Sequence, residues 1–196
     1  MRAFSEERDA FPPAYAKSLR KQVLASRYFA VNTLNRDFVG TRGFSVVFRR
    51  DSLPRVMREL PYFAPYLERA LHPECNAFYL NPLLLVGGSR VDPHIDRSLQ
   101  SYVVHVDTPR LVTVMYVEVP PGMRGGELVL QRGKKHLGRI TPTANTLVTF
   151  AGDLTHSIDR LDTQGSRLSL VCEQYDLPPE ELEQIPELAI ETRARY

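Results

Sequence analysis

From about residue 76 onward the sequence alternates between short β-rich runs and turn signals, and this pattern constrains the fold most. The runs are NAFYLNPLLLV, LVTVMYVEV, GELVL, TLVTF and RLSLVCEQY, separated by segments such as GGS, PPGMRGG, AGD and DTQGS. β-Branched and aromatic residues favour strands, whereas Gly, Asp and Pro favour turns. The spacing therefore predicts an antiparallel sandwich or barrel over residues 73–177.

The first third of the sequence has a helical pattern instead. Apolar residues recur at helical spacing from Pro13 to about Ala30, Ser52 is a suitable N-cap for a second helix, and PYFAPYLERAL predicts a third. The acidic segment from Pro178 has some helical character. We expect a mainly β chain of the α+β class that forms a single domain, with a helical support region (1–72), a β core (73–177) and a tail (178–196).

Composition excludes several functional classes. The formal net charge of +2 is too small to indicate a nucleic-acid partner. Two cysteines, Cys75 and Cys172, are far apart and suggest neither a disulfide framework nor a cysteine metal site. No run reaches the ~18 apolar residues of a membrane span, and the amino terminus lacks the apolar core of a signal peptide, so we expect a cytoplasmic protein without a membrane partner.

The stretch VDPHIDRSL contains a candidate pair of metal ligands, His94 and Asp96. Alternate residues of a strand share one face, so the two side chains can reach one ion. An HxD pair alone is a weak signal, but His156 follows the strand TLVTF and a Gly-Asp turn and can supply a third ligand. Two imidazoles and one carboxylate are typical of a non-haem Fe(II) centre with open positions, whereas closed zinc sites have four protein ligands.

Arg167 follows His156 across the next turn and shares a strand face with Ser169. A buried guanidinium that faces a metal pocket needs an anion between itself and the cation, and its fork suits a carboxylate. The pattern therefore favours a dicarboxylate ligand with one end on the metal. The alternative is an exposed ion pair between Arg167 and Asp159 or Asp162.

The order HxD, GGELVL (125–130), distal His and RxS resembles the Fe(II)/2-oxoglutarate-dependent dioxygenases, particularly their prolyl-4-hydroxylase-like branch, over about residues 76–175. The resemblance implies a double-stranded β-helix, the jelly-roll barrel of the cupins. It implies that His94, Asp96 and His156 bind iron, and that Arg167 and Ser169 bind the distal carboxylate of 2-oxoglutarate. Ascorbate is expected to support activity.

Two features of the sequence depart from this family pattern. Prolyl hydroxylases often carry a tyrosine on the strand after HxD as a further 2-oxoglutarate contact, but the residue that aligns there is Val117, with Tyr116 expected on the other face. If GGS (87–89) is the centre of a hairpin, His94 lies opposite Pro82, and Asn81 near the metal becomes a further candidate 2-oxoglutarate contact.

A second HxD pair, His105 and Asp107, competes for the role of metal ligands. No Gly-Gly turn precedes it, so His94 and Asp96 are favoured, but the alternative stays open.

The resemblance implies hydroxylation of an unactivated C–H bond in a peptide or protein residue, an amino acid or a small metabolite. O2 is consumed, and succinate and CO2 are formed. A carboxylate at Asp96 favours hydroxylation, because halogenating relatives have a small residue there. Two alternatives are a non-catalytic cupin-like module that binds metal and 2-oxoglutarate as a sensor, and a hydrolytic or isomerising cupin with a fourth protein ligand.

Overall fold

A computed structural model describes residues 3–31 and 37–194 of the chain. The ends of the predicted support region and tail, residues 1–2 and 195–196, and the segment 32–36 lie outside the described part. Over the described ranges, no helix is long and apolar enough to cross a membrane.

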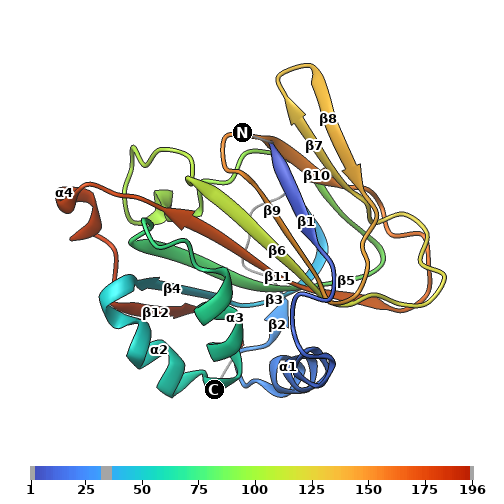
Figure 1. Ribbon diagram of the computed structural model, residues 1–196, viewed down its shortest axis with the longest axis horizontal. Helices are drawn as coiled ribbons and strands as arrows, with labels where there is room; N and C mark the ends of the chain where they lie inside the picture. Colours follow the sequence, from blue (N-terminus) through green and yellow to red (C-terminus); the bar gives the residue numbers. More distant parts are fainter. Residues whose placement is uncertain (1–2, 32–36, 195–196) are drawn as a thin grey trace.

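The strands form a continuous antiparallel sheet that curls into a barrel-like shape (Figure 1). Within the described residues it has 12 strands, with the main order β1-β9-β6-β11-β5-β10-β7-β8. One half contains β1 (Phe4–Glu7), β9 (Thr146–Ala151), β6 (Leu111–Glu118), β11 (Ser166–Tyr175) and the beginning of β5 (Ala77–His94). The other half contains the end of β5, β10 (Thr155–Ile158), β7 (Leu128–Arg132) and β8 (Lys135–Ile140). The five predicted runs of the β core are all strands, and the predicted double-stranded β-helix is confirmed.

Strand β5 belongs to both halves of the sheet, which corrects the predicted hairpin. Its first half pairs with β11, with Leu85 opposite Arg167, and its last residue, His94, pairs with His156 of β10. Gly88 has a φ of +90° and lies at the bend where β5 leaves one half for the other. Pro82 therefore lies opposite Leu170, not His94. The Gly-Gly pair bends one long strand and does not reverse the chain.

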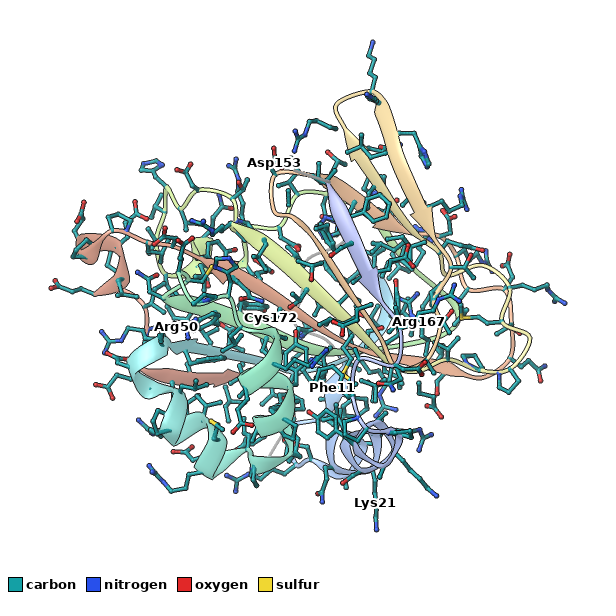
Figure 2. All side chains as sticks on the ribbon, in the orientation of Figure 1. Phe11, Lys21, Arg50, Asp153, Arg167 and Cys172 are labelled. Carbon is teal, nitrogen blue, oxygen red and sulfur yellow. The ribbon has the colours of Figure 1, made fainter. Side chains whose placement is uncertain are left out.

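Three predicted helices cover the outer face of the first half (Figure 1). They are α1 (Pro13–Ala25), α2 (Leu53–Glu59) and α3 (Ala64–Ala70), the last preceded by a 3-10 turn, Pro61–Phe63. Helix α1 ends five residues before the predicted boundary, because Ser26 adopts an extended conformation. Ser52 precedes α2, but its hydroxyl bonds Asp51 and makes no capping hydrogen bond. Figure 2 shows Lys21 extending from α1 away from the sheet, while Phe11 lies between α1 and the strands.

The first third is less helical than predicted. It also contributes β1, β2 (Ala30–Val31), β3 (Phe38–Gly43) and β4 (Ser45–Arg49). Strands β3 and β4 pair with β5 and extend the sheet beyond the predicted β core. In the tail, a single helical turn, α4 (Pro179–Leu182), is followed by β12 (Leu188–Glu191), which pairs with β4.

Strand alternation separates a helix-covered face from an interior face. On β11, Leu168, Leu170 and Cys172 pack in the cluster beneath the helices. The intervening residues face the space between the two halves of the sheet, and those lining its cavities are Arg167, Ser169, Val171 and Glu173. The run RLSLVCEQY thus places four cavity-lining residues, among them the predicted site residues Arg167 and Ser169, on the inside of the barrel.

Candidate active site

His94, Asp96 and His156 come together at one end of the interior. Each offers a ligand atom, and these atoms all lie within 4.8 Å of one another. Nε2 of His94 lies 3.1 Å from Oδ1 of Asp96, and Nε2 of His156 lies 3.3 Å from Oδ2. Among the described residues this is the group of three that could hold a metal ion.

Backbone carbonyls orient both imidazoles. Nδ1 of His94 lies 2.8 Å from the carbonyl oxygen of Asp92, and Nδ1 of His156 lies 3.2 Å from that of Leu154. A carbonyl oxygen only accepts, so each Nδ1 carries the proton and donates it. Each Nε2 is therefore the atom presented to Asp96 and to a metal, the arrangement by which proteins fix metal-binding histidines.

Asp96 is a buried carboxylate whose charge is stabilised by the two histidines. Burial acts to raise its pKa, but electrostatic attraction to His156 and His94 and the hydrogen bond with His94 outweigh burial and hold the pKa well below its usual range. Conversely, burial acts to lower the pKa of His94, and the hydrogen bond and charge of Asp96 raise it overall. The group therefore keeps an anionic oxygen ligand in the interior.

The local geometry of the HxD pair differs from the predicted one. Strand β5 ends at His94, so Asp96 lies just beyond the strand, and the side chain of Ile95 is 40% exposed instead of packing in the opposite layer. The alternative pair does not join the site: His105 is exposed, and Asp107 lines a separate open cavity with Arg110.

Arg167 lies in the same inner cavity as the three candidate ligands. Its side chain is only 1% exposed. Nη1 donates to the carbonyl of Gly126, in the predicted GGELVL segment, while Nε is buried without a hydrogen-bond partner. Burial lowers the pKa of Arg167 from its usual value.

The predicted alternative ion pair of Arg167 is not formed. Asp159 instead pairs with Arg139, and Asp162 with Arg160. A guanidinium buried without a carboxylate partner is costly unless an anion joins it. Arg167 therefore suits a carboxylate ligand in this cavity.

Ser169 and Tyr116 lie beside Arg167 in the inner cavity. The hydroxyl of Ser169 is buried without a partner, and the Tyr116 ring centroid is 5.4 Å from the guanidinium carbon of Arg167. Val117 packs instead in the cluster beneath the helices. The predicted orientation of this pair is thus wrong: Tyr116 faces the cavity, and Val117 faces outward because the helices need an apolar face there.

Asn81 and two residues missed by the sequence analysis complete the surroundings. Asn81 lines a smaller cavity beside Asp96, together with Glu173, and not the cavity of Arg167. Phe38 of β3 has its ring 5.1 Å from that of His94. Burial and the charge of Asp96 raise the pKa of Glu173 to about 8, although Ser98 and Tyr175 hydrogen-bond to it.

The site opens to the surface through a mouth of about 450 Å³ formed mainly by the segment from His94 to Gln100. The inner cavity is lined largely by apolar side chains, including Leu83, Val114, Leu128 and Phe150. The site thus has an open entrance, three side chains suited to bind a metal ion, and the cationic side chain of Arg167 at its inner end.

Comparisons with known proteins agree with this geometry. Residues 82–172 match the 2OG-Fe(II) oxygenase superfamily. A comparison with curated protein sequences finds no match.

Solved structures share the fold at low sequence identity. A prolyl-4-hydroxylase from Pseudomonas putida has a TM-score of 0.60 and 17% identity, over 90% of this chain and 94% of the other. A prolyl hydroxylase from Trichoplax adhaerens, in complex with a hypoxia inducible factor peptide fragment, has a TM-score of 0.60 and 15% identity, over 93% and 87%. HygX from Streptomyces hygroscopicus, with nickel and 2-oxoglutarate bound, has a TM-score of 0.57 and 14% identity, over 87% and 82%.

The matched segment contains His94, Asp96, His156, Arg167 and Ser169. The cofactors of this superfamily, ferrous iron and 2-oxoglutarate, are those that the resemblance implied, and they agree with the Fe(II) centre and the dicarboxylate predicted from the residues. Over residues 82–172 the chain is therefore similar to the 2OG-Fe(II) oxygenase superfamily.

Proposed function

We propose that the protein is a hydroxylase that oxidises an unactivated C–H bond of a peptide residue, an amino acid or a small metabolite. It would use Fe(II), 2-oxoglutarate and O2 and form succinate and CO2. One observation carries the proposal: a buried guanidinium without a carboxylate partner shares a cavity with two histidines and an aspartate at metal-ligand spacing. A cation at each end suits a dicarboxylate between them.

The chemistry of the donor atoms fits both cofactors. His94, Asp96 and His156 would hold the metal, and Oδ2 of Asp96 is buried without a hydrogen bond. Arg167 and Ser169 would hold the distal carboxylate, because Nε and Oγ are both buried without partners. When bound, iron and 2-oxoglutarate would activate O2, the oxidant, which protein side chains alone cannot do.

The protein's own part is to orient and to exclude water. The carbonyls of Asp92 and Leu154 hold the two imidazoles, and the apolar wall keeps the inner cavity dry. Because Asp96 provides a carboxylate ligand, no metal position is left for a halide at that place, which supports hydroxylation over halogenation. The Trichoplax structure with a bound peptide supports a peptide as one substrate class to test.

Succinate release tests the proposal. The purified protein, supplied with Fe(II), ascorbate and 2-oxoglutarate, is screened against peptides, free amino acids and cell-extract fractions. We expect one class to stimulate succinate formation and to gain one oxygen atom by mass spectrometry. Metal and 2-oxoglutarate binding without succinate under every condition would favour the sensor alternative. An absorption band in the visible region on anaerobic addition of 2-oxoglutarate to the Fe(II) protein would argue against a hydrolytic cupin.

The cytoplasmic location and the absence of nucleic-acid and membrane partners stay predictions.

A further inference from the structure

A small cavity with both polar and apolar lining residues lies beside Asp96, further along β11 from Arg167. Its volume is about 20 Å³, room for a single water-sized group. Its lining residues are Phe38, Tyr79, Asn81, Leu83, Asp96, Ser98, Val171 and Glu173. Four of these, Phe38, Leu83, Asp96 and Val171, also line the inner cavity, so the two cavities adjoin at the candidate metal group.

Asn81 offers this cavity a hydrogen-bond acceptor without a partner. Its side chain is 3% exposed, and Nδ2 donates to the carbonyl of Phe44 at 2.8 Å and to Oγ of Ser45 at 3.2 Å. A carbonyl only accepts, which fixes the amide orientation. Oδ1 is therefore the atom left over, and it is buried with no hydrogen bond. A buried acceptor of this kind needs a donor from a ligand or from water.

Glu173 gives the same cavity a carboxylate. Its side chain is 3% exposed and accepts hydrogen bonds from the backbone N–H of Ser98 at 3.0 Å, from the Ser98 hydroxyl and from the Tyr175 hydroxyl. A carboxylate has about four acceptor sites, so these three bonds leave capacity for another donor. Because two residues of the entrance segment, Asp96 and Ser98, line the cavity with Glu173, a molecule that enters through the mouth can reach it.

The other polar groups around the cavity have no donor to spare. Tyr79 accepts from Ser45 and donates to Glu191, and the Ser98 hydroxyl donates to Glu173. Within the described residues, the cavity therefore presents mainly acceptors, together with the negative charge of Asp96. Glu173 keeps a proton while no cation is bound, because burial and Asp96 raise its pKa to about 8, and a cation beside it would favour its ionised form. A carboxylate or phosphate substituent would be repelled, whereas a group with several N–H donors and a positive charge would be stabilised.

We propose that this cavity is a substrate subsite that receives a primary ammonium group, so that the substrate is a small molecule or a residue carrying a primary amine. The ammonium would donate to Oδ1 of Asn81 and to the carboxylate of Glu173. That contact holds the rest of the substrate beside Asp96 and the metal. The inference rests on the proposed oxygenase function, because it assigns a substrate class to the same site.

Paramagnetic relaxation tests the subsite without turnover. The full chain is loaded with Mn(II) in place of iron and with 2-oxoglutarate, and methylammonium is the probe. We expect its methyl protons to relax faster, in a saturable manner, than in a matched sample loaded with diamagnetic Zn(II). Methanol, which is neutral, and tetramethylammonium, which has no N–H donor, should show no saturable effect.

Two variants and one matched control assign the effect to the cavity. Glu173→Gln and Asn81→Leu should each weaken the apparent methylammonium affinity by about tenfold or more, as expected for loss of a charge-assisted or buried hydrogen bond. Glu118→Gln makes the same chemical change at a carboxylate paired with Arg20 outside the cavity, and it should leave the affinity unchanged.

Each other outcome is decisive. No enhancement by methylammonium would show that the cavity does not bind an ammonium group, and equal enhancement by tetramethylammonium or methanol would show that the probes approach the metal without selectivity. Either result would overturn the inference. Unchanged affinity in Glu173→Gln would do the same. If the variants fail to fold, the three probes on the wild-type protein decide. Failure of the protein to bind Mn(II) and 2-oxoglutarate would be seen before any probe is added, and it would overturn the proposed function itself.

Discussion

His94 and His156 occupy directly opposed positions of the antiparallel pair β5–β10, with their ring centroids 4.4 Å apart. Two residues far apart in the sequence thus converge because one strand register brings them together. Asp96, just beyond the strand end, completes the group.

We expect His156→Ala to lower the affinity for Fe(II) or Ni(II) by more than about 100-fold. Removing a residue that only orients a metal ligand usually lowers metal affinity by about 10- to 100-fold, and removing the ligand itself should cost more. Equilibrium dialysis or calorimetry measures the change. His105→Ala is the matched control and should bind metal like the wild type. If His105→Ala loses metal and His156→Ala does not, the second HxD pair supplies the ligands.

Arg167→Gln should raise the dissociation constant of 2-oxoglutarate by about 10- to 100-fold, because charge-assisted hydrogen bonds contribute about 1.5–3 kcal/mol. Calorimetry with the Ni(II) protein measures it in the absence of turnover. Arg132→Gln, at a surface pair with Asp153, is the control and should bind normally. In the ligand-free protein, Arg167→Gln should lower the free energy of unfolding by less than it weakens the binding free energy of 2-oxoglutarate. The reason is that the buried cation has no carboxylate partner to lose. Unchanged 2-oxoglutarate binding would remove Arg167 from the site.

Tyr116 and Val117 should behave oppositely. Tyr116→Leu should weaken 2-oxoglutarate binding, because its ring lies beside Arg167 inside the cavity. Val117→Ala should leave that affinity unchanged but lower the unfolding free energy by about 1–3 kcal/mol, because Val117 packs beneath the helices. Calorimetry and denaturant unfolding separate the two effects. Weaker binding in Val117→Ala alone would restore the orientation predicted from the sequence.

The pH dependence of stability should change in Glu173→Gln. Burial and the charge of Asp96 raise the Glu173 pKa from 4.5 to about 8, so the folded metal-free protein binds a proton that the unfolded chain releases. Its contribution to stability is complete below about pH 4.5 and is lost as the pH rises through about 8. Relative to wild type, the Gln variant should therefore gain stability between pH 5 and 8, as measured by urea unfolding. A constant difference across this range would contradict the raised pKa.

The β core and the metal group could be predicted because their signals are local. The runs from residue 76 alternate or are rich in β-branched residues, and HxD, the distal His and RxS each lie on or next to such a run. Strand β4 was missed because SVVFR is an apolar run without alternation, which does not distinguish a strand from a buried helix. Strand β8 was missed because KHLGRI is largely polar, and such a segment is typical of an exposed hairpin turn.

The errors within the site have non-local causes. Whether Gly87 and Gly88 reverse the chain or bend it depends on the partners of β5, which are β11 and β10, far along the sequence. The face of Tyr116 depends on which side of β6 the helices cover. Glu173, in contrast, could have been found, because it shares the strand parity of Arg167 and Ser169.

Strand β5 has a consequence for the length of the acid that the protein can accept. In β5, Leu85 pairs with Arg167 and His94 pairs with His156. The nine-residue step from Leu85 to His94, which includes the bend, therefore sets the distance between the guanidinium and the imidazoles. An insertion or deletion at the bend would change that separation without replacing any side chain that contacts the acid. We therefore expect the backbone geometry of this single strand to determine which chain length of diacid the protein prefers.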